Sequence, residues 1–218
     1  MRADIGCGPG RFIDIARQKG ATVIGFDLSD AVEAAADIFK DDEHVLICQA
    51  DVLALPLRNS VLDGCFSIGV LHHSNNAHAG FLEMVRATKT SGWIAAAVYG
   101  TGGYYGDFFV RIWRKIFKTL WPVFGHYPPL WYSYMVVYAT RPLYKVPLLN
   151  TIVRPLLGYI PHIQLRDIRW SVLDTFDSVT PSNQYGYSVF EVFNWFKEAG
   201  LRDIEPSNWG GASLHAKK

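Results

Sequence analysis

The segment Asp4-Ile5-Gly6-Cys7-Gly8-Pro9-Gly10-Arg11, near the beginning of the chain, decides how the remaining sequence is interpreted. Its glycines stand at alternate positions, and a residue without a Cβ lets the backbone turn sharply and approach a ligand closely. A short apolar run precedes the glycines, and Phe12, Ile15 and Ala16 follow at helical spacing. The sequence therefore predicts a strand, a cofactor-binding turn and a helix.

Strand and helix patterns alternate from residue 1 to about residue 100, as is typical of a parallel α/β sheet. The predicted strands cover residues 3–5, 22–26, 44–49, 62–70 and 93–99. Residues 188–199 predict a helix that stops at Gly200, and residues 201–209 and 212–216 predict a hairpin. We expect a doubly wound, mostly parallel sheet of seven strands with an antiparallel last strand.

Residues 101–187 interrupt this alternation. Within them, residues 104–165 hold 15 of the 31 aromatic residues and a formal charge of +6, in a chain of 218 residues whose net charge is +1. That length and apolar content support one domain plus an elaboration. We expect an α/β core at 1–100, an aromatic, basic helical cap at 101–187, and a helix and hairpin at 188–218 that complete the core sheet.

The insertion also has two membrane interpretations, which compete with the cap. Residues 119–140 carry no formal charge and are long enough for a membrane span, but their prolines and Gly125 would break such a helix. Residues 104–120 alternate apolar and basic side chains, which favours contact with a membrane surface. No nucleic-acid-binding module is visible, so we expect no nucleic-acid partner. We favour a cap that forms an acceptor pocket, with residues 104–120 as the candidate for peripheral membrane contact.

The cysteines and the first residues indicate the compartment. Cys7, Cys48 and Cys65 have neither metal-ligand spacing nor a disulfide framework, which predicts no metal site and a reducing environment. No apolar run follows a basic start, so we expect no signal peptide and a cytoplasmic protein.

Residues after the predicted strands narrow the class of ligand. Arg11 stands where the dinucleotide fingerprint has its third glycine, which disfavours a nicotinamide or flavin cofactor. Asp27 ends the second strand, where a carboxylate can accept hydrogen bonds from both hydroxyls of a ribose. Asp51 follows the third strand and can accept a hydrogen bond from the exocyclic amine of an adenine. Each aspartate alone could instead be a helix N-cap.

Taken together, these segments resemble the class I S-adenosylmethionine-dependent methyltransferases, in the small-molecule branch that includes quinone-biosynthesis enzymes. Residues 4–10 resemble the first motif of that family, residues 25–29 its ribose-binding motif, residues 50–56 its adenine-binding motif and residues 62–73 its fourth-strand motif. The resemblance covers residues 1 to about 100 and again about 170 to 218. It departs from the family at residues 88–93, where a Leu-Lys-Pro-Gly-Gly turn is common.

The resemblance implies S-adenosylmethionine as cofactor and methyl transfer to a small acceptor, for which a lipophilic molecule is one candidate. His72 and His73 follow the fourth strand, beside the transferred methyl group, and are candidates for a general base. The implied cofactor-binding residues are Asp4, Gly6, Cys7, Gly8, Gly10, Asp27, Leu28, Asp51, Val52, Ile68 and Val70. Candidate acceptor contacts are Asp174, Asp177, Tyr185 and Tyr187.

Two other functions stay open beside the methyltransferase. Such enzymes usually carry a helical segment before the first motif, whereas Met1 stands three residues before Asp4, so we expect a shortened or misplaced start. A non-catalytic cofactor-binding remnant that serves as a membrane-surface or partner-binding module is the first alternative. A nicotinamide-dependent oxidoreductase is the second.

Overall fold

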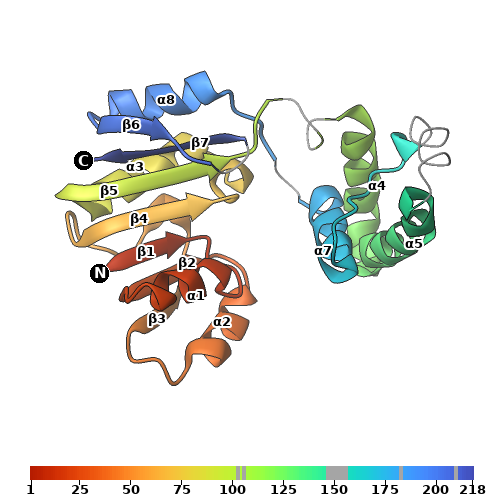
Figure 1. Ribbon diagram of the computed structural model, residues 1–218, viewed down its shortest axis with the longest axis horizontal. Helices are drawn as coiled ribbons and strands as arrows, with labels where there is room; N and C mark the ends of the chain where they lie inside the picture. Colours follow the sequence, from red (N-terminus) through yellow and green to blue (C-terminus); the bar gives the residue numbers. More distant parts are fainter. Residues whose placement is uncertain (102–103, 105–106, 146–156, 182–183, 209–210) are drawn as a thin grey trace. The chain divides into compact units, whose positions relative to one another are not determined.

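The computed structural model describes residues 1–101, 104, 107–145, 157–181, 184–208 and 211–218 (Figure 1). The chain divides into two compact units. We call Met1–Thr101 with Asn183–Lys218 the core unit and Gly102–Ser182 the helical unit. Tyr185 and Tyr187, which the sequence analysis placed in the insertion, belong to the core unit.

The core unit is built on a sheet of seven strands in the order β3-β2-β1-β4-β5-β7-β6 (Figure 1). Strands β1 to β5 run parallel, and β7 runs antiparallel to both β5 and β6. The predicted doubly wound sheet with an antiparallel last strand is therefore confirmed. The strands are β1 (Arg2–Ile5), β2 (Val23–Asp27), β3 (Val45–Gln49), β4 (Leu62–Ile68), β5 (Thr88–Val98), β6 (Arg202–Pro206) and β7 (Ala212–Lys217).

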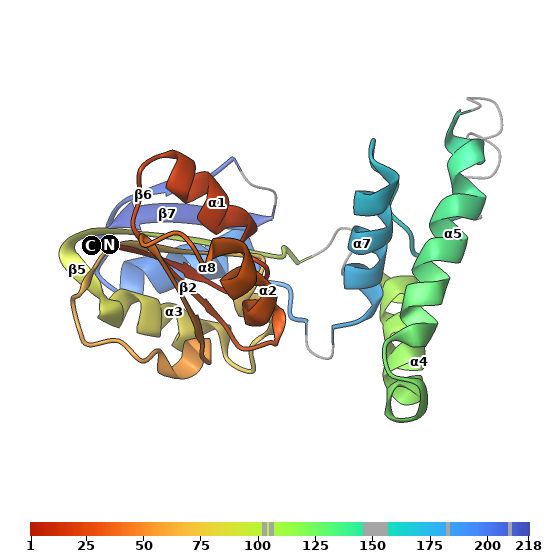
Figure 2. The same cartoon turned by 90° about the horizontal axis from the view of Figure 1, so that it is seen from below.

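Helices cover the two faces of this sheet, and Figure 2 shows α1 and α3 on opposite sides of it. Neighbouring residues of a strand point to opposite faces, so Val23 packs with Ile13 of α1 while Ile24 belongs to the larger cluster. In that cluster the rings of Phe81 in α3 and Phe196 in α8 lie 4.6 Å apart. The helical segments are α1 (Arg11–Gln18), α2 (Ala31–Phe39), α3 (Ala77–Ala87), α8 (Val189–Glu198) and the short 3-10 turns η1 (Val52–Ala54) and η2 (Leu71–His73).

The strand order reverses between β1 and β4. From β1 the chain adds β2 and then β3 on one side, and it returns to add β4 and β5 on the other. In open α/β sheets such a switch point opens a crevice at the carboxyl ends of the strands, where ligands bind. The glycine turn follows β1 at this switch point.

The start of β5 differs from the prediction. Ser91-Gly92 predicts a turn, but Thr88 follows α3 directly and already pairs with Leu62 of β4. Gly64 then pairs with Trp93, so the extra residues are taken up as an irregularity in register. Pairing with β4 has overridden the local turn preference.

The chain leaves and re-enters the core unit at adjacent points. The N–H of Tyr187 donates to the carbonyl of Tyr99 at 2.9 Å, and the N–H of Thr101 donates to the carbonyl of Tyr187 at 3.1 Å. Helix α8 then begins with a capping box, in which Ser188 and Glu191 each accept from the other's backbone N–H. The returning chain is thereby fixed at the edge of β5.

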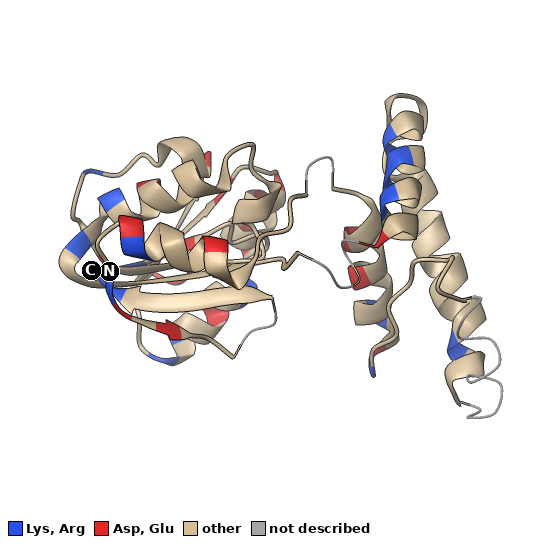
Figure 3. Ribbon diagram, turned by 90° about the horizontal axis from the view of Figure 1, so that it is seen from above, with Lys and Arg blue, Asp and Glu red and all other residues tan. Residues whose placement is uncertain are grey.

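The helical unit contains α4 (Phe108–Phe124), α5 (Tyr127–Lys145) and α7 (Ile168–Val179). Its buried cluster includes Phe117, Tyr132 and Val172, one from each helix. Pro128 and Pro129 stand in the first turn of α5, where their missing N–H is not needed. Basic residues are spaced along α4, which contains no acidic residue (Figure 3). In the part of the chain that the structure describes, no helix is long and apolar enough to cross a membrane.

Candidate functional site

The glycine turn after β1 is built from left-handed backbone. Gly6, Gly8 and Gly10 have φ values of +82°, +51° and +94°. A Cβ on Gly6 would lie 2.3 Å from Val70 Cγ2, and one on Gly10 would lie 2.4 Å from the ring of Phe39, so packing requires glycine at both. A Cβ on Gly8 would meet nothing within 4 Å. Gly8 therefore presents bare backbone to open space, as close approach to a ligand requires.

The carboxylate of Asp27 at the end of β2 is joined to this turn. Its Oδ2 accepts from the N–H of Gly8 at 2.8 Å. Its Oδ1 accepts from the N–H and the hydroxyl of Ser29 at 2.9 and 2.7 Å. A carboxylate has about four lone-pair sites, so these bonds leave acceptor capacity for a ligand hydroxyl. Ser29 was not predicted as a site residue, although it lies within residues 25–29, which resemble the ribose-binding motif.

Asp4 of β1 is a buried acid with an unused oxygen. It is 1% exposed, and its Oδ2 has no hydrogen-bond partner among the described residues. Burial, and secondarily the charge of Asp27, raises the pKa of Asp4 to about 8. Buried polar atoms are nearly always paired, so an orphaned one indicates a missing partner such as a ligand.

Cys7 packs beneath the turn as an apolar residue. It is 4% exposed and clusters with Ile13 and Val23. Burial, followed by the charges of Asp4 and Asp27, raises the pKa of its thiol to about 12. The side chain therefore stays protonated and has no nucleophilic character.

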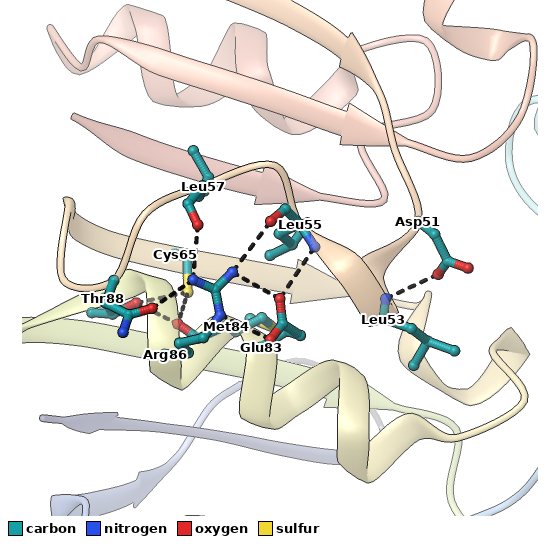
Figure 4. A network of polar contacts seen from close by, with 10 residues as sticks. Asp51, Leu53, Leu55, Leu57, Cys65, Glu83, Met84, Arg86 and Thr88 are labelled. Atoms are coloured by element: carbon teal, nitrogen blue, oxygen red, sulfur yellow. Dashed lines mark hydrogen bonds and ion pairs between the residues drawn. The ribbon is translucent and has the colours of Figure 1, made fainter.

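Asp51 begins the 3-10 turn η1, where its Oδ1 accepts from the N–H of Leu53 at 2.9 Å. It is thus an N-cap, as one alternative held, and its other oxygen points away from the capped turn (Figure 4). Of the residues predicted beside Asp27 and Asp51, Leu28 directly follows β2 and is 66% exposed, and Val52 is the first residue of η1.

A charged pair in α3 fixes the segment that follows Asp51 (Figure 4). Arg86 donates to the carbonyls of Leu55 and Leu57 at 3.2 and 2.8 Å, and Glu83 accepts from the N–H of Leu55 at 3.2 Å. The side chains of Arg86 and Glu83 bond each other at 2.8 Å. Neither residue was predicted from the sequence. Their spacing of three along a helix was visible, but their contacts with the loop were not.

The end of β4 brings two histidines and a tyrosine together. Ile68 and Val70 lead into η2, where His72 is fully buried and His73 half-buried. The ring of His72 lies 4.1 Å from that of His73 and 3.9 Å from that of Tyr99. Tyr99 follows β5 and was missed, although the end of a parallel strand beside β4 is where a site residue is expected.

The hydrogen bond to His72 assigns its tautomer. The N–H of Tyr99 donates to His72 Nδ1 at 3.4 Å, so in the neutral ring the proton resides on Nε2. The nitrogen of His72 that could take up a proton is already engaged. His73 is therefore the better placed of the two for general-base chemistry.

The candidate acceptor contacts fall into both units. Tyr185 donates its N–H to the carbonyl of His72 at 3.0 Å, and the Tyr187 ring packs 4.9 Å from Trp195 in the core unit. Asp174 and Asp177 lie on α7 of the helical unit. The structure therefore gathers the cofactor candidates at the strand ends of one unit but divides the acceptor candidates between two.

The residues at the switch point fit a nucleoside-like ligand that carries a cationic group. Asp27 and Asp51 offer acceptors for hydroxyl and amine donors, Asp4 offers a buried carboxyl, and Gly8 leaves room above the turn. Among the described residues, no three His, Cys, Asp or Glu side chains gather as a metal ion would require.

Comparison with known proteins identifies the class of this domain. A family model described as a methyltransferase domain matches residues 3–96. The tRNA (carboxymethyluridine(34)-5-O)-methyltransferase ALKBH8 of Mus musculus is 40% identical over 94 residues, which make up 41% of this chain and 13% of that protein. The malonyl-[acyl-carrier protein] O-methyltransferase of Serratia marcescens is 29% identical over 99 residues, 45% of this chain and 38% of that protein. The chain thus spans less than half the length of these relatives.

A solved structure shows the same fold over most of the chain. Phosphoethanolamine N-methyltransferase 2 of Haemonchus contortus, in complex with S-adenosyl-L-methionine, aligns with a TM-score of 0.55 and 16% identity. The alignment covers 95% of this chain and 34% of that one.

Proposed function

Since residues 3–96 are a class I S-adenosylmethionine-dependent methyltransferase domain, we propose that this protein transfers a methyl group from that cofactor to a small, lipophilic acceptor. One observation carries the proposal: the open backbone of Gly8 lies beside a bonded carboxylate, Asp27, and the orphaned carboxyl of Asp4 is buried in the adjoining strand. S-adenosylmethionine carries both the ribose hydroxyls and the positive charge that such a site suits.

Each residue of the site has a role in this proposal. Asp27 accepts from the ribose hydroxyls and Asp51 from the adenine amine, while Gly8 admits the methionine portion to the backbone. Ile68 and Val70 form the apolar floor beneath the sulfur. Arg86 and Glu83 act as positioning residues because they hold the loop after Asp51.

When bound, the cofactor supplies a methyl group on a positively charged sulfur, which keeps the electron pair of the broken bond as the acceptor takes the methyl group. The protein contributes alignment of the acceptor and exclusion of water. If the acceptor is a hydroxyl or an acidic carbon, His73 takes up its proton, while His72 holds the ring of His73 in place.

The lipophilic character of the acceptor is the finer part of the proposal. The relatives named above act, by their names, on a tRNA and on a carrier-bound malonyl group, but they share only the domain with this chain. The aromatic composition of the helical unit supports an apolar acceptor. Tyr185, Tyr187, Asp174 and Asp177 stay candidates for contact with it, and a cap role for the helical unit stays a prediction.

Calorimetric titration tests the cofactor assignment. We expect S-adenosylmethionine and S-adenosylhomocysteine to bind and NAD not to bind. Failure of both sulfur compounds to bind at millimolar concentration would reject the enzyme and favour the non-catalytic remnant. Mass spectrometry of ligands that co-purify with the protein would then identify the acceptor class.

Substitution of the histidines tests the proposed base. We expect His73→Ala to lower kcat about 100-fold, the usual contribution of a positioned base, and to flatten the pH profile of kcat. The His72→Ala variant should lose less. Unchanged turnover in the double variant would remove both residues from the chemistry.

A further inference from the structure

Helix α5 presents a row of aromatic side chains to solvent. Tyr127, Trp131, Tyr134 and Tyr138 recur at helical spacing, which places them on one face. Their exposed fractions are 71%, 73%, 50% and 55%. Large apolar and aromatic side chains exposed together mark an interaction site rather than an ordinary surface.

The row borders an apolar groove between α4 and α5. The groove has a volume of about 620 Å³. Trp113 and Phe117 line it from α4, and Trp131, Tyr134 and Met135 line it from α5. Met135 is 66% exposed although it is apolar. The helical unit thus buries only part of its apolar surface within itself.

The exposed face of α4 adds charge to this surface. Arg111, Lys115 and Lys118 recur at spacings of four and three residues and are all exposed. Phe108, Ile112 and Ile116 lie beside them on the same helix, and their exposed fractions are 59%, 38% and 43%. Neither α4 nor α5 contains an acidic residue. The α4–α5 face, as we call these two sets together with the row on α5, is therefore apolar and basic, and neither helix contributes an acidic residue to it.

We infer that the α4–α5 face docks on the surface of an anionic phospholipid bilayer. Tyrosine and tryptophan favour the boundary between headgroups and acyl chains, where the ring is buried and its polar tip stays hydrated. Basic side chains beside an apolar helix face are drawn to anionic headgroups. Both features occur on α4 and α5. The positive charge of the α4–α5 face complements the negative charge of the lipid headgroups.

Charge also argues against a second copy as the occupant. In a two-fold symmetric dimer the same patch lies on both sides of the interface. Arg111 and Lys115 would then face the same basic residues of the other copy with no acidic residue of either helix between them. Like charges so placed disfavour association, whereas anionic lipids neutralise them.

The inference goes beyond the proposed methyl transfer, because no cofactor-site residue contributes to the α4–α5 face. It would hold the methyltransferase domain at the surface in which lipophilic molecules dissolve.

Vesicle co-sedimentation of the full chain tests the inference. We expect binding to vesicles of equal parts phosphatidylcholine and phosphatidylglycerol, weakened by added salt, and little binding to phosphatidylcholine alone. Arg111→Gln with Lys115→Gln should lower the partition coefficient about 30-fold, from the usual contribution of a basic residue near such a surface. Trp131→Ala should weaken binding as well.

A matched pair of exposed lysines in the core unit serves as control: Lys19→Gln with Lys40→Gln removes the same charge and should leave binding unchanged. No binding to anionic vesicles, or equal losses in the two double variants, would overturn the inference. So would a dimer in solution that Trp131→Ala dissociates, because the occupant would then be a second copy. Calorimetry with S-adenosylmethionine should give the same result in all these variants, which separates a failure here from a failure of the cofactor site.

Discussion

The α3–α8 contact of the core unit and helix α5 of the helical unit use aromatic residues in opposite ways. In the core unit, Phe81 and Phe196 are fully buried and their rings pack against each other between α3 and α8. In the helical unit, Trp131 and Tyr127 are 73% and 71% exposed on α5. The same class of side chain therefore packs between two helices of the core unit and forms the outer surface of α5 in the helical unit. Composition records only that aromatics are present, whereas burial shows what they do.

The candidate binding surfaces of the two units also differ in charge. The core unit places Asp4, Asp27 and Asp51 at the carboxyl ends of its strands, around a turn with open backbone. The helices α4 and α5 carry basic residues and no acids. The core unit thus suits a ligand with hydrogen-bond donors and positive charge, and the α4–α5 face suits an anionic lipid surface.

Removal of one aromatic side chain from each unit gives the largest expected contrast. Phe81→Ala should lower the free energy of unfolding of the core unit by about 3–5 kcal/mol, because it leaves a cavity in a packed cluster. Trp131→Ala should change stability by no more than about 0.5 kcal/mol. Denaturant unfolding followed by circular dichroism measures both, and similar losses would mean that the exposed row on α5 is structural.

Two glycines with the same backbone preference separate ligand contact from strain. Gly8 and Gly20 have φ values of +51° and +75°, and a Cβ on either would meet nothing within 4 Å. Gly8→Val and Gly20→Val should therefore destabilise the fold alike. Only Gly8→Val should weaken S-adenosylmethionine binding, by about 100-fold, as expected for overpacking against a bound ligand. Equal affinities by calorimetry would place the cofactor elsewhere.

Substitution of the acid at the end of β2 has a smaller expected effect. Asp27→Asn keeps the shape of the side chain but removes its charge, and it should weaken cofactor binding about tenfold, as loss of a hydrogen bond to a charged group does. Asp37→Asn, at an exposed position of α2, is the matched control and should bind normally. If both variants bind alike, Asp27 serves only the turn at Gly8.

The buried acid of β1 predicts a dependence of stability on pH. The pKa of Asp4 is raised from 3.8 to about 8 in the folded chain, so the folded state holds this proton more tightly than the unfolded state. Its stabilising contribution is complete below about pH 4 and is lost as the pH rises toward about 8. Without cofactor, the Tm of the wild type should fall relative to that of Asp4→Asn by about 4 °C for each pH unit between about pH 5 and pH 7. Parallel curves would contradict this.

Local sequence predicted the parts of the fold and site that depend on spacing. The glycine turn, Asp27 and Asp51 stand at strand ends because each strand ends where its alternating or apolar run ends. The helix after Ser188 was visible for the same reason, since a cap and a periodic apolar face lie next to each other in the chain.

Contacts between distant segments were beyond such reasoning. The bonds of Arg86 to Leu55 and Leu57, and the bond from Tyr99 that assigns the tautomer of His72, join residues far apart in sequence. The turn expected at Ser91-Gly92 failed because β4 pairs with that segment. The outward orientation of Trp131 could not be predicted from the sequence either, because a helical stripe of aromatics can face a core or solvent.

The backbone hydrogen bonds that join Tyr99 and Thr101 to Tyr187 affect which changes of the inserted segment the core unit can tolerate. The two ends of the segment 102–182 leave the core unit side by side, already joined by backbone hydrogen bonds that involve no side chain. A segment held in this way can be lengthened, exchanged or cut down to a short hairpin with little loss of loop-closure entropy and no change in strand register. At these backbone hydrogen bonds the core unit can therefore acquire a different inserted segment, with a different binding surface, while its own fold stays the same.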